Sequence, residues 1–130
     1  MDKDCVFCKI ANGSLPAHTL YEDGDVSAFL DLYPATRGQT LIILKKHVDY
    51  IFDLENSEYT KLFLKAKELG KAIDRALKPV RTCIVVEGLS VGHVHIRLHP
   101  CYEQTLKLGS SEKAENEDLK ATAEKIKKFL

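Results

Sequence analysis

Apolar and polar residues alternate without interruption between Gly92 and Pro100. The aliphatic positions are Val94, Ile96 and Leu98, and the polar positions are His93, His95, Arg97 and His99. Successive side chains of a β-strand project to opposite faces, so this pattern predicts one strand with an aliphatic face and a face of imidazole and guanidinium groups. We expect the aliphatic face to enter the core.

Four shorter segments upstream also have the composition of strands. They are residues 19–22, 26–30, 40–44 and 82–86. Glu22-Asp23-Gly24-Asp25 separates the first two and is typical of a hairpin turn. The connection at residues 87–90 is too short for a parallel crossover, so it predicts that the last two strands are antiparallel neighbours.

One segment has the period of a helix instead. From Tyr59 to Leu77 the apolar residues follow the 3.6-residue repeat of an amphipathic helix. Asn56 or Ser57 can cap its start, and Pro79 stops it.

The charged tail that begins at Ser111 predicts a second helix. Its apolar residues, at near-helical spacing, are Leu119, Ala123, Ile126 and Leu130. Together these elements predict a single α+β domain over residues 1–130, with an antiparallel sheet of about five strands, a long central helix and a C-terminal helix.

Composition narrows the range of partners. Lys and Arg together number 19, as do Asp and Glu, so the chain lacks the broad basic surface with which proteins hold nucleic acid. No apolar run approaches the ~20 residues that span a bilayer, and the N-terminus Met1–Asp4 is too polar for a signal peptide. We therefore expect a cytoplasmic protein that binds neither nucleic acid nor membrane.

The row of polar residues at 93–99 suits phosphate chemistry. Three of the five histidines of the chain fall within these seven residues. A neutral imidazole can act as a nucleophile, a proton carrier or a metal ligand near neutral pH, and Arg offers a fixed positive fork to phosphate oxygens. A lone histidine on a strand is usually a plain polar residue, but the count here favours a functional row.

Cys5-Val-Phe-Cys8 offers two thiolates at the spacing of metal ligands. A redox pair and two inert thiols are the competing interpretations, and a structural metal would need two more ligands. Of the other cysteines, Cys83 is expected to be a buried small apolar residue, and Cys101 has no assignment.

Several motifs together resemble one known family. Gly92-His-Val-His-Ile-Arg-Leu98 is similar to the histidine triad motif of the HIT superfamily of nucleotide hydrolases and transferases, in its zinc-bearing branch. Residues 5–10, 26–31, 34–43 and 45–47 fall in the order and spacing of the same family. The resemblance covers nearly the whole chain and implies a HIT-like fold.

The resemblance also implies a reaction. The middle histidine of the triad, His95, would attack the α-phosphate of a purine nucleotide such as an AMP conjugate and form a nucleotidyl-His intermediate that water resolves. The substrates implied are phosphoramidates and dinucleoside polyphosphates, and the assembly implied is a homodimer. Asp31 would receive the ribose hydroxyls, Leu32 would line the base pocket, and Ser90 would contact phosphate.

The metal ligands implied by the resemblance are Cys5, Cys8, His47 and His93, around a structural zinc ion. Four protein ligands would close the coordination sphere and leave no position for a reacting water. A zinc-ribbon nucleic-acid binder is disfavoured, because the chain has no second closely spaced Cys pair and no net positive charge.

Three positions depart from the family pattern. Arg97 stands at the third triad position, where it can stabilise charge but cannot deliver a proton to a leaving group. Gln39 replaces a histidine, and Val86 replaces an asparagine that contacts the phosphate side of the site. Gln39 and His99 are nevertheless expected, with Arg97, among the nucleotide- or phosphate-binding residues. His99 is a candidate substitute acid and equally a plain surface residue. These changes leave two functions open, a hydrolase or nucleotidyl transferase with His95 and Arg97 as catalytic residues, and a catalytically weak or inactive nucleotide-binding, zinc-stabilised interaction protein.

Overall fold

The strands form one antiparallel sheet with the order β1-β2-β3-β5-β4. The computed structural model describes residues 4–110 and 112–130, and within them the strands are β1 (Thr19–Glu22), β2 (Val26–Leu30), β3 (Thr40–Leu44), β4 (Arg81–Val85) and β5 (His95–Cys101). The helices are α1 (Val6–Ala11), the 3-10 turn η1 (Ile51–Asp53), α2 (Asn56–Leu77) and α3 (Asn116–Lys127). The α+β class and the antiparallel sheet predicted from the sequence are therefore confirmed.

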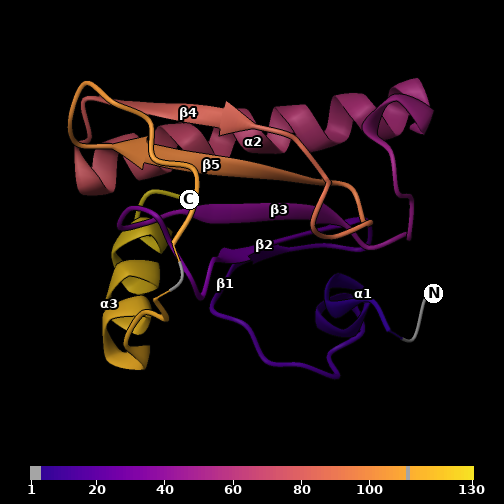
Figure 1. Ribbon diagram of the computed structural model, residues 1–130, viewed down its shortest axis with the longest axis horizontal. Helices are drawn as coiled ribbons and strands as arrows, with labels where there is room; N and C mark the ends of the chain where they lie inside the picture. Colours follow the sequence, from indigo (N-terminus) through magenta and orange to yellow (C-terminus); the bar gives the residue numbers. More distant parts are fainter. Residues whose placement is uncertain (1–3, 111) are drawn as a thin grey trace.

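The larger core lies on one face of this sheet, beneath α2 and α3. Figure 1 shows α2 running alongside β4 and β5, with α3 near one end of the sheet. The aliphatic positions of the alternating segment, Val94, Ile96 and Leu98, pack in this core with α2 residues such as Leu62 and Leu69. Burial of these side chains fixes which face β5 turns inward, because a shift of one residue would exchange its two faces.

The opposite face carries a smaller core under α1. Phe7 and Cys8 of α1 pack there against Phe29, Leu41 and Ile43. The sequence did not predict α1, because a helix of six residues is too short to show a period. This is the face toward which His95 and Arg97 point, since they alternate with the core residues of β5.

Helix α2 begins and ends differently in detail from the sequence prediction. Its N-cap is Glu55 rather than Asn56 or Ser57, and the Glu55 side chain and the Glu58 side chain each accept a backbone hydrogen bond from the other end of a capping box. The helix ends at Leu77, where Lys78 adopts a left-handed conformation before Pro79. Glu is outside the typical Ser/Thr/Asp/Asn set of N-cap residues, so the sequence prediction placed the N-cap one or two residues too late.

Other boundaries also moved. Strand β5 begins at His95 rather than at Gly92, and Val94 reaches the core from the preceding loop. In α3, Leu119, Ala123 and Ile126 are buried as expected, but Leu130 lies beyond the helix and is half exposed. Met1, Asp2 and Lys3, used above against a signal peptide, and Ser111 lie outside the described residues. Within residues 4–110 and 112–130, no helix has both the length and the apolar character needed to cross a membrane.

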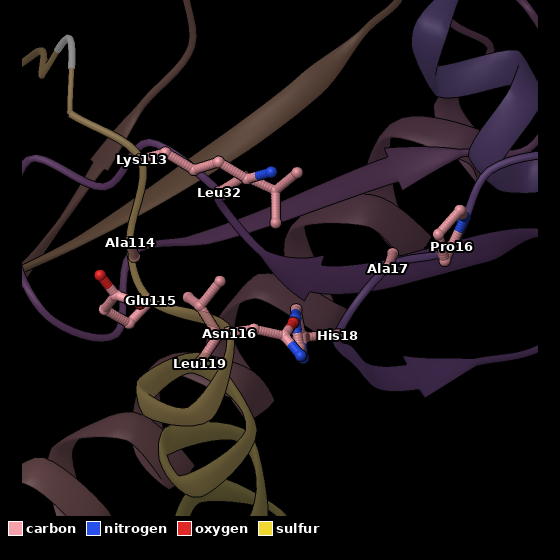
Figure 2. Close-up of a pocket in the computed structure, with 9 residues that line it drawn as sticks. All are labelled: Pro16, Ala17, His18, Leu32, Lys113, Ala114, Glu115, Asn116 and Leu119. Carbon is pink, nitrogen blue, oxygen red and sulfur yellow. The ribbon is translucent and has the colours of Figure 1, made fainter.

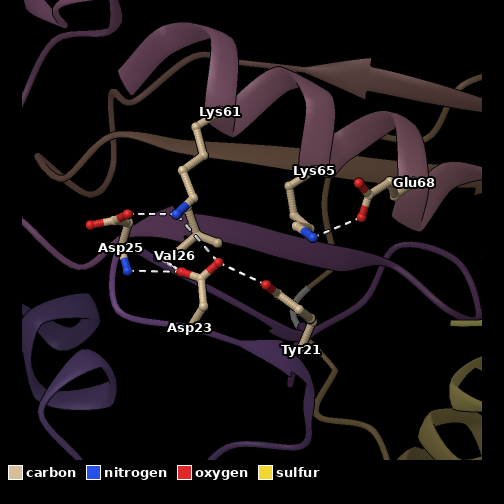
Figure 3. Close-up of polar contacts among 7 residues, drawn as sticks. All are labelled: Tyr21, Asp23, Asp25, Val26, Lys61, Lys65 and Glu68. Atoms are coloured by element: carbon tan, nitrogen blue, oxygen red, sulfur yellow. Dashed lines mark hydrogen bonds and ion pairs between the residues drawn. The ribbon is translucent and has the colours of Figure 1, made fainter. Parts of the chain in front are cut away.

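A polar network joins the β1–β2 turn to α2 on the surface (Figure 3). Asp23 accepts hydrogen bonds from the Tyr21 hydroxyl and from the backbone N–H groups of Asp25 and Val26, and Lys61 forms ion pairs with both aspartates. Partial burial would by itself raise the pKa of Asp23, but these hydrogen bonds and the charge of Lys61 outweigh it and lower that pKa well below its usual value. The ionised carboxylate therefore stabilises the folded state.

We expect Leu69→Ala to lower the free energy of unfolding by about 2–5 kcal/mol, because Leu69 is fully buried under the sheet and its removal leaves a cavity. Leu64→Ala is the matched control on the same helix, since Leu64 is half exposed. Urea denaturation of both variants checks this. Equal stability losses would contradict the assignment of the core face of α2.

We also expect stability to depend on Asp23 in acid. Because the pKa of Asp23 is lowered in the folded state, its contribution is fully present above the pKa of the unfolded chain, about 4, and is lost as the pH falls through the folded pKa. Asp23→Asn should flatten the fall of unfolding free energy below that pH, and Tyr21→Phe should flatten it partly. Identical pH slopes in wild type and Asp23→Asn would refute this.

Candidate functional site

A cleft of about 380 Å³ lies between α1 and the face of the sheet that β5 lines with polar groups. Its apolar wall includes Phe7, Ile10, Phe29 and Leu41. Its polar groups are Asp31, Ser90, His95 and Arg97. The register pairs Leu41 with Arg97 and Ile43 with His95, so these apolar side chains of β3 lie beside the polar side chains of β5 on the same face of the sheet. A cleft with a long apolar wall and few polar groups is suited to a small molecule with an aromatic part and a charged part.

His95 is held by two contacts from its own neighbourhood. Its Nδ1 donates a hydrogen bond to the His93 carbonyl at 2.7 Å, which leaves the Nε2 lone pair available for chemistry. The Phe7 ring packs edge-on against the imidazole with 4.9 Å between centroids. Burial lowers the pKa of His95, an effect that the His93 carbonyl and the Glu87 charge partly oppose, so the ring is neutral near pH 7.

Arg97 is already engaged by protein groups. Its Nη2 donates to the Leu108 carbonyl at 2.7 Å, and its Nη1 lies 3.8 Å from a Glu87 carboxylate oxygen. Among the described residues, its buried Nε has no hydrogen-bond partner. The guanidinium therefore ties the segment after β5 to the site while part of it still faces the cleft.

Asp31 and Gln39 form one unit, which the sequence did not predict. The Gln39 amide donates to Asp31 Oδ2 at 2.8 Å and accepts from the Ala35 N–H, and Asp31 Oδ1 accepts from the Tyr33 N–H at 2.9 Å. Gln39 is buried and is not among the residues that line the cleft. Gln39 therefore holds Asp31 in place from outside the cleft. The two residues are eight apart in sequence, and no sequence pattern predicts this contact.

Of the other predicted residues, some line the cleft and some do not. Ser90 and Leu32 line the cleft with His95. His99 lies completely buried on the same face of β5 as Arg97, outside the lining of the cleft. Burial, and next the charge of Arg97, lower the pKa of His99. Val86 is packed at the margin of the large core.

Four donor atoms converge beside the cleft. The ligand atoms of Cys5, Cys8, His47 and His93 lie within 4.8 Å of one another. Cys8 Sγ is 3.2 Å from His47 Nδ1 and 3.4 Å from His93 Nδ1. His93 Nε2 donates to the Leu44 carbonyl at 2.6 Å, which turns the lone pair of its Nδ1 toward the sulfurs. Two cysteine sulfurs and two imidazole nitrogens that lie this close together form a set that suits a metal ion.

This cluster and the cleft share Phe7. The Phe7 ring contacts His93 at 5.9 Å and His95 at 4.9 Å between centroids, in both cases edge-on. Because Phe7 lies between the two cysteines in sequence, any ion held there also fixes the ring that positions His95. Sequence reasoning missed this role, although an aromatic residue inside a Cys-x-x-Cys motif was visible.

A second cavity, of about 610 Å³, adjoins the cleft (Figure 2). The two share Pro16, Ala17 and Leu32. The second cavity lies at the start of α3, where His18 Nε2 is 2.9 Å from Asn116 Oδ1. It contains neither His95 nor Arg97, so the smaller cleft is the candidate for the chemistry.

Comparison with known proteins agrees with this geometry. The HIT domain family matches residues 12–104, and an uncharacterized HIT-like protein of Methanocaldococcus jannaschii is 32% identical over 95% of this chain and 98% of its own length. The chain belongs to the HIT family.

Two solved structures share the fold of this chain. A hypothetical histidine triad nucleotide-binding protein of Sulfolobus tokodaii has a TM-score of 0.86 at 26% identity, covering 96% of this chain and 91% of that one. A Zn-bound histidine triad family protein of Mycobacterium smegmatis has a TM-score of 0.82 at 26% identity, covering 97% and 92%.

We expect Cys8→Ser to remove most bound metal from the purified protein, because a hydroxyl is a far weaker ligand than a thiolate for the metals that choose cysteine and histidine. Cys83→Ser is the control, since Cys83 is not one of the four residues of the cluster. Elemental analysis of both variants gives the metal-to-protein ratio. A ratio unchanged in Cys8→Ser would exclude the four-residue site.

Proposed function

We propose that this protein is a nucleotide hydrolase or nucleotidyl transferase that acts at the α-phosphate of a purine nucleotide conjugate through His95. One observation carries the proposal: His95, with its Nε2 free, lines the same cleft as Asp31, Ser90 and Arg97. Membership of the HIT family, and the nucleotide-binding description of the Sulfolobus structure, support it.

The reaction proceeds in two displacements. The lone pair of His95 Nε2 attacks the α-phosphorus, a P–N bond forms, and the bond from phosphorus to the leaving group breaks with its electron pair. Water then attacks the phosphorus, the P–N bond breaks, and the imidazole is regenerated with release of the nucleoside monophosphate. A nucleophile that is neutral at pH 7 needs no separate base for the first step, and the covalent intermediate divides one difficult step into two.

The cleft offers a place for each part of a nucleoside monophosphate. The wall of Phe7, Ile10 and Phe29 suits a purine ring, and Leu32 closes the same pocket. Asp31, held by Gln39 and the Tyr33 N–H, retains lone pairs for the two ribose hydroxyls. Ser90 and the part of Arg97 that faces the cleft contact phosphate oxygens.

Arg97 sets the kind of leaving group. A guanidinium stays protonated and supplies charge without delivering a proton. Arg97 cannot deliver a proton to the leaving group, and the buried His99 does not line the cleft. Leaving groups that depart without an added proton are therefore favoured. Phosphoanhydrides and other conjugates with acidic leaving groups are therefore turned over faster than those with basic leaving groups.

The metal proposed for Cys5, Cys8, His47 and His93 is structural zinc. Zn–S bonds of about 2.3 Å and Zn–N bonds of about 2.0 Å place a tetrahedral S···N pair about 3.5 Å apart and an N···N pair about 3.3 Å apart. The S···N distances here are 3.2–3.4 Å, and the distance between the two Nδ1 atoms is 3.2 Å. The Zn-bound Mycobacterium structure supports this choice. When bound, zinc would fasten the N-terminal segment, and with it Phe7, beside His95.

A homodimer is proposed for the assembly, and the cytoplasm for its location. Strand β4 has no partner on its outer edge among the described residues, and the side chain of Ile84 within it is exposed. Pairing with a second copy would satisfy this edge and cover Ile84. Cytoplasmic conditions would keep Cys5 and Cys8 as thiols able to bind metal.

The second candidate is a nucleotide-binding, zinc-stabilised interaction protein with little turnover. The observation that favours it is the engagement of Arg97 by Leu108 and Glu87, which leaves less of its charge for a transition state. The two candidates share the cleft and differ in whether His95 forms the adduct.

We expect His95→Ala to abolish release of AMP from adenosine phosphoramidate and from a diadenosine polyphosphate, to below about one thousandth of the wild-type rate. Wild type should show an acid-labile AMP adduct by intact mass, and His95→Ala should not. His18→Ala, a histidine outside the cleft, is the matched control. Wild-type binding of AMP without turnover of either substrate would support the second candidate, and equal turnover by wild type and His95→Ala would end the first.

We expect Arg97→His to restore acid assistance, raising turnover of substrates with basic leaving groups by about tenfold or more, with little gain for acidic ones. Rates across a series of leaving groups of different pKa measure this as a change in slope. Arg97→Lys, which keeps the charge, is the control. A slope unchanged by Arg97→His would show that proton delivery does not limit the reaction.

A further inference from the structure

Two cysteines outside the metal cluster lie in contact on the last two strands of the sheet. The Sγ atoms of Cys83 in β4 and Cys101 in β5 are 3.9 Å apart, and both thiols are free. The sequence predicted that Cys83 is a buried small apolar residue, but Cys83 is only partly buried. Nothing in the proposed nucleotide chemistry uses either thiol.

Solvent reaches this pair through a cavity of its own. The cavity measures about 420 Å³, and Cys83 and Cys101 line it together with Arg81 and Glu103. It shares no lining residue with the nucleotide cleft. A small polar oxidant such as hydrogen peroxide can therefore reach the sulfurs without entering the candidate active site.

The environment gives the two sulfurs different roles. The Cys101 thiol donates toward Cys83 Sγ and also lies 3.4 Å from the His99 carbonyl. Burial raises the pKa of Cys101, and the neighbouring Cys83 reinforces this, so Cys101 keeps its proton. Cys83 is the more exposed of the two residues and lines the cavity beside Arg81, so its sulfur is the one that an incoming oxidant meets first.

We infer that Cys83 and Cys101 form a peroxide-oxidisable dithiol, a modification site separate from both the nucleotide cleft and the metal cluster. The Cys83 thiolate attacks one oxygen of hydrogen peroxide, the O–O bond breaks, and Cys83 sulfenic acid and hydroxide form. Cys101 gives its proton to hydroxide and attacks the sulfur of Cys83, and the S–O bond breaks. The sum is two thiols and one peroxide giving one disulfide and two waters, with two electrons passing from sulfur to peroxide.

The strand register makes this disulfide reversible. Cys83 lies opposite His99, and Cys101 lies opposite Arg81, so the two cysteines are diagonal neighbours rather than a directly opposed pair. A bond of about 2.05 Å between diagonal positions requires the sulfurs to approach and the strands to adjust. Such strained disulfides are reduced readily by cellular thiols, in contrast to structural ones.

The test is treatment of the purified, metal-containing protein with a modest molar excess of hydrogen peroxide, followed by alkylation under denaturing conditions. Intact mass should show loss of two hydrogen atoms and of two alkylation sites. Trypsin cuts after Arg81, Arg97 and Lys107, so the crosslink should join peptides 82–97 and 98–107. Dithiothreitol should restore both thiols.

Three variants distinguish the roles of the sulfurs. Cys101→Ser should accumulate a sulfenic acid at Cys83, detected as one added oxygen atom and trapped by dimedone, whereas Cys83→Ser should leave Cys101 reduced at the same dose. The double variant Cys83→Ser/Val85→Cys keeps a thiol on the same face of β4 but moves it two residues, and it should form no crosslink. The inference is overturned if wild type keeps both thiols while peroxide oxidises Cys5 and Cys8, or if the crosslink joins two chains instead of two strands.

Discussion

The two-residue period of β5 is the constraint on which the rest of the molecule depends. Burial of Ile96 and Leu98 beneath α2 leaves His95 and Arg97 no direction except the opposite face of the sheet. On that face, the apolar side chains of Leu41 and Ile43 in β3 lie beside those of Arg97 and His95. The hydrophobic core therefore determines the direction in which His95 and Arg97 point. A change in register would disrupt both the site and the core.

The second layer of organisation is the N-terminal segment. By itself α1 is too short to be stable, and it is held by burial of Phe7 and Cys8 and by the cluster with His47 and His93. This anchorage places Phe7 against His95 and closes one wall of the cleft. An ion held by this cluster would therefore be coupled to His95, the proposed nucleophile, through one aromatic ring.

Arg97 and Gln39, which the sequence resemblance marks as departures from the expected pattern, both contact other parts of the protein. Arg97 anchors the backbone at Leu108 as well as facing the cleft, and Gln39 supports Asp31. The same part of β5 ends at Cys101, beside Cys83, where a second kind of reactivity is possible. One hairpin, β4–β5, therefore carries the proposed nucleophile, its electrostatic partner and the dithiol.

The sequence by itself determined the strands, the long helix and the order of the motifs, because periods of 2 and 3.6 residues and turn residues are local signals. It also named the histidine row and the Cys-x-x-Cys pair. Only the tertiary structure decided that Gln39 contacts Asp31, that His99 lies away from the cleft, that Arg97 binds Leu108, and that Cys83 meets Cys101. Each of these contacts depends on which strands are neighbours and in what register. Such long-range pairings produce no periodic pattern in the sequence.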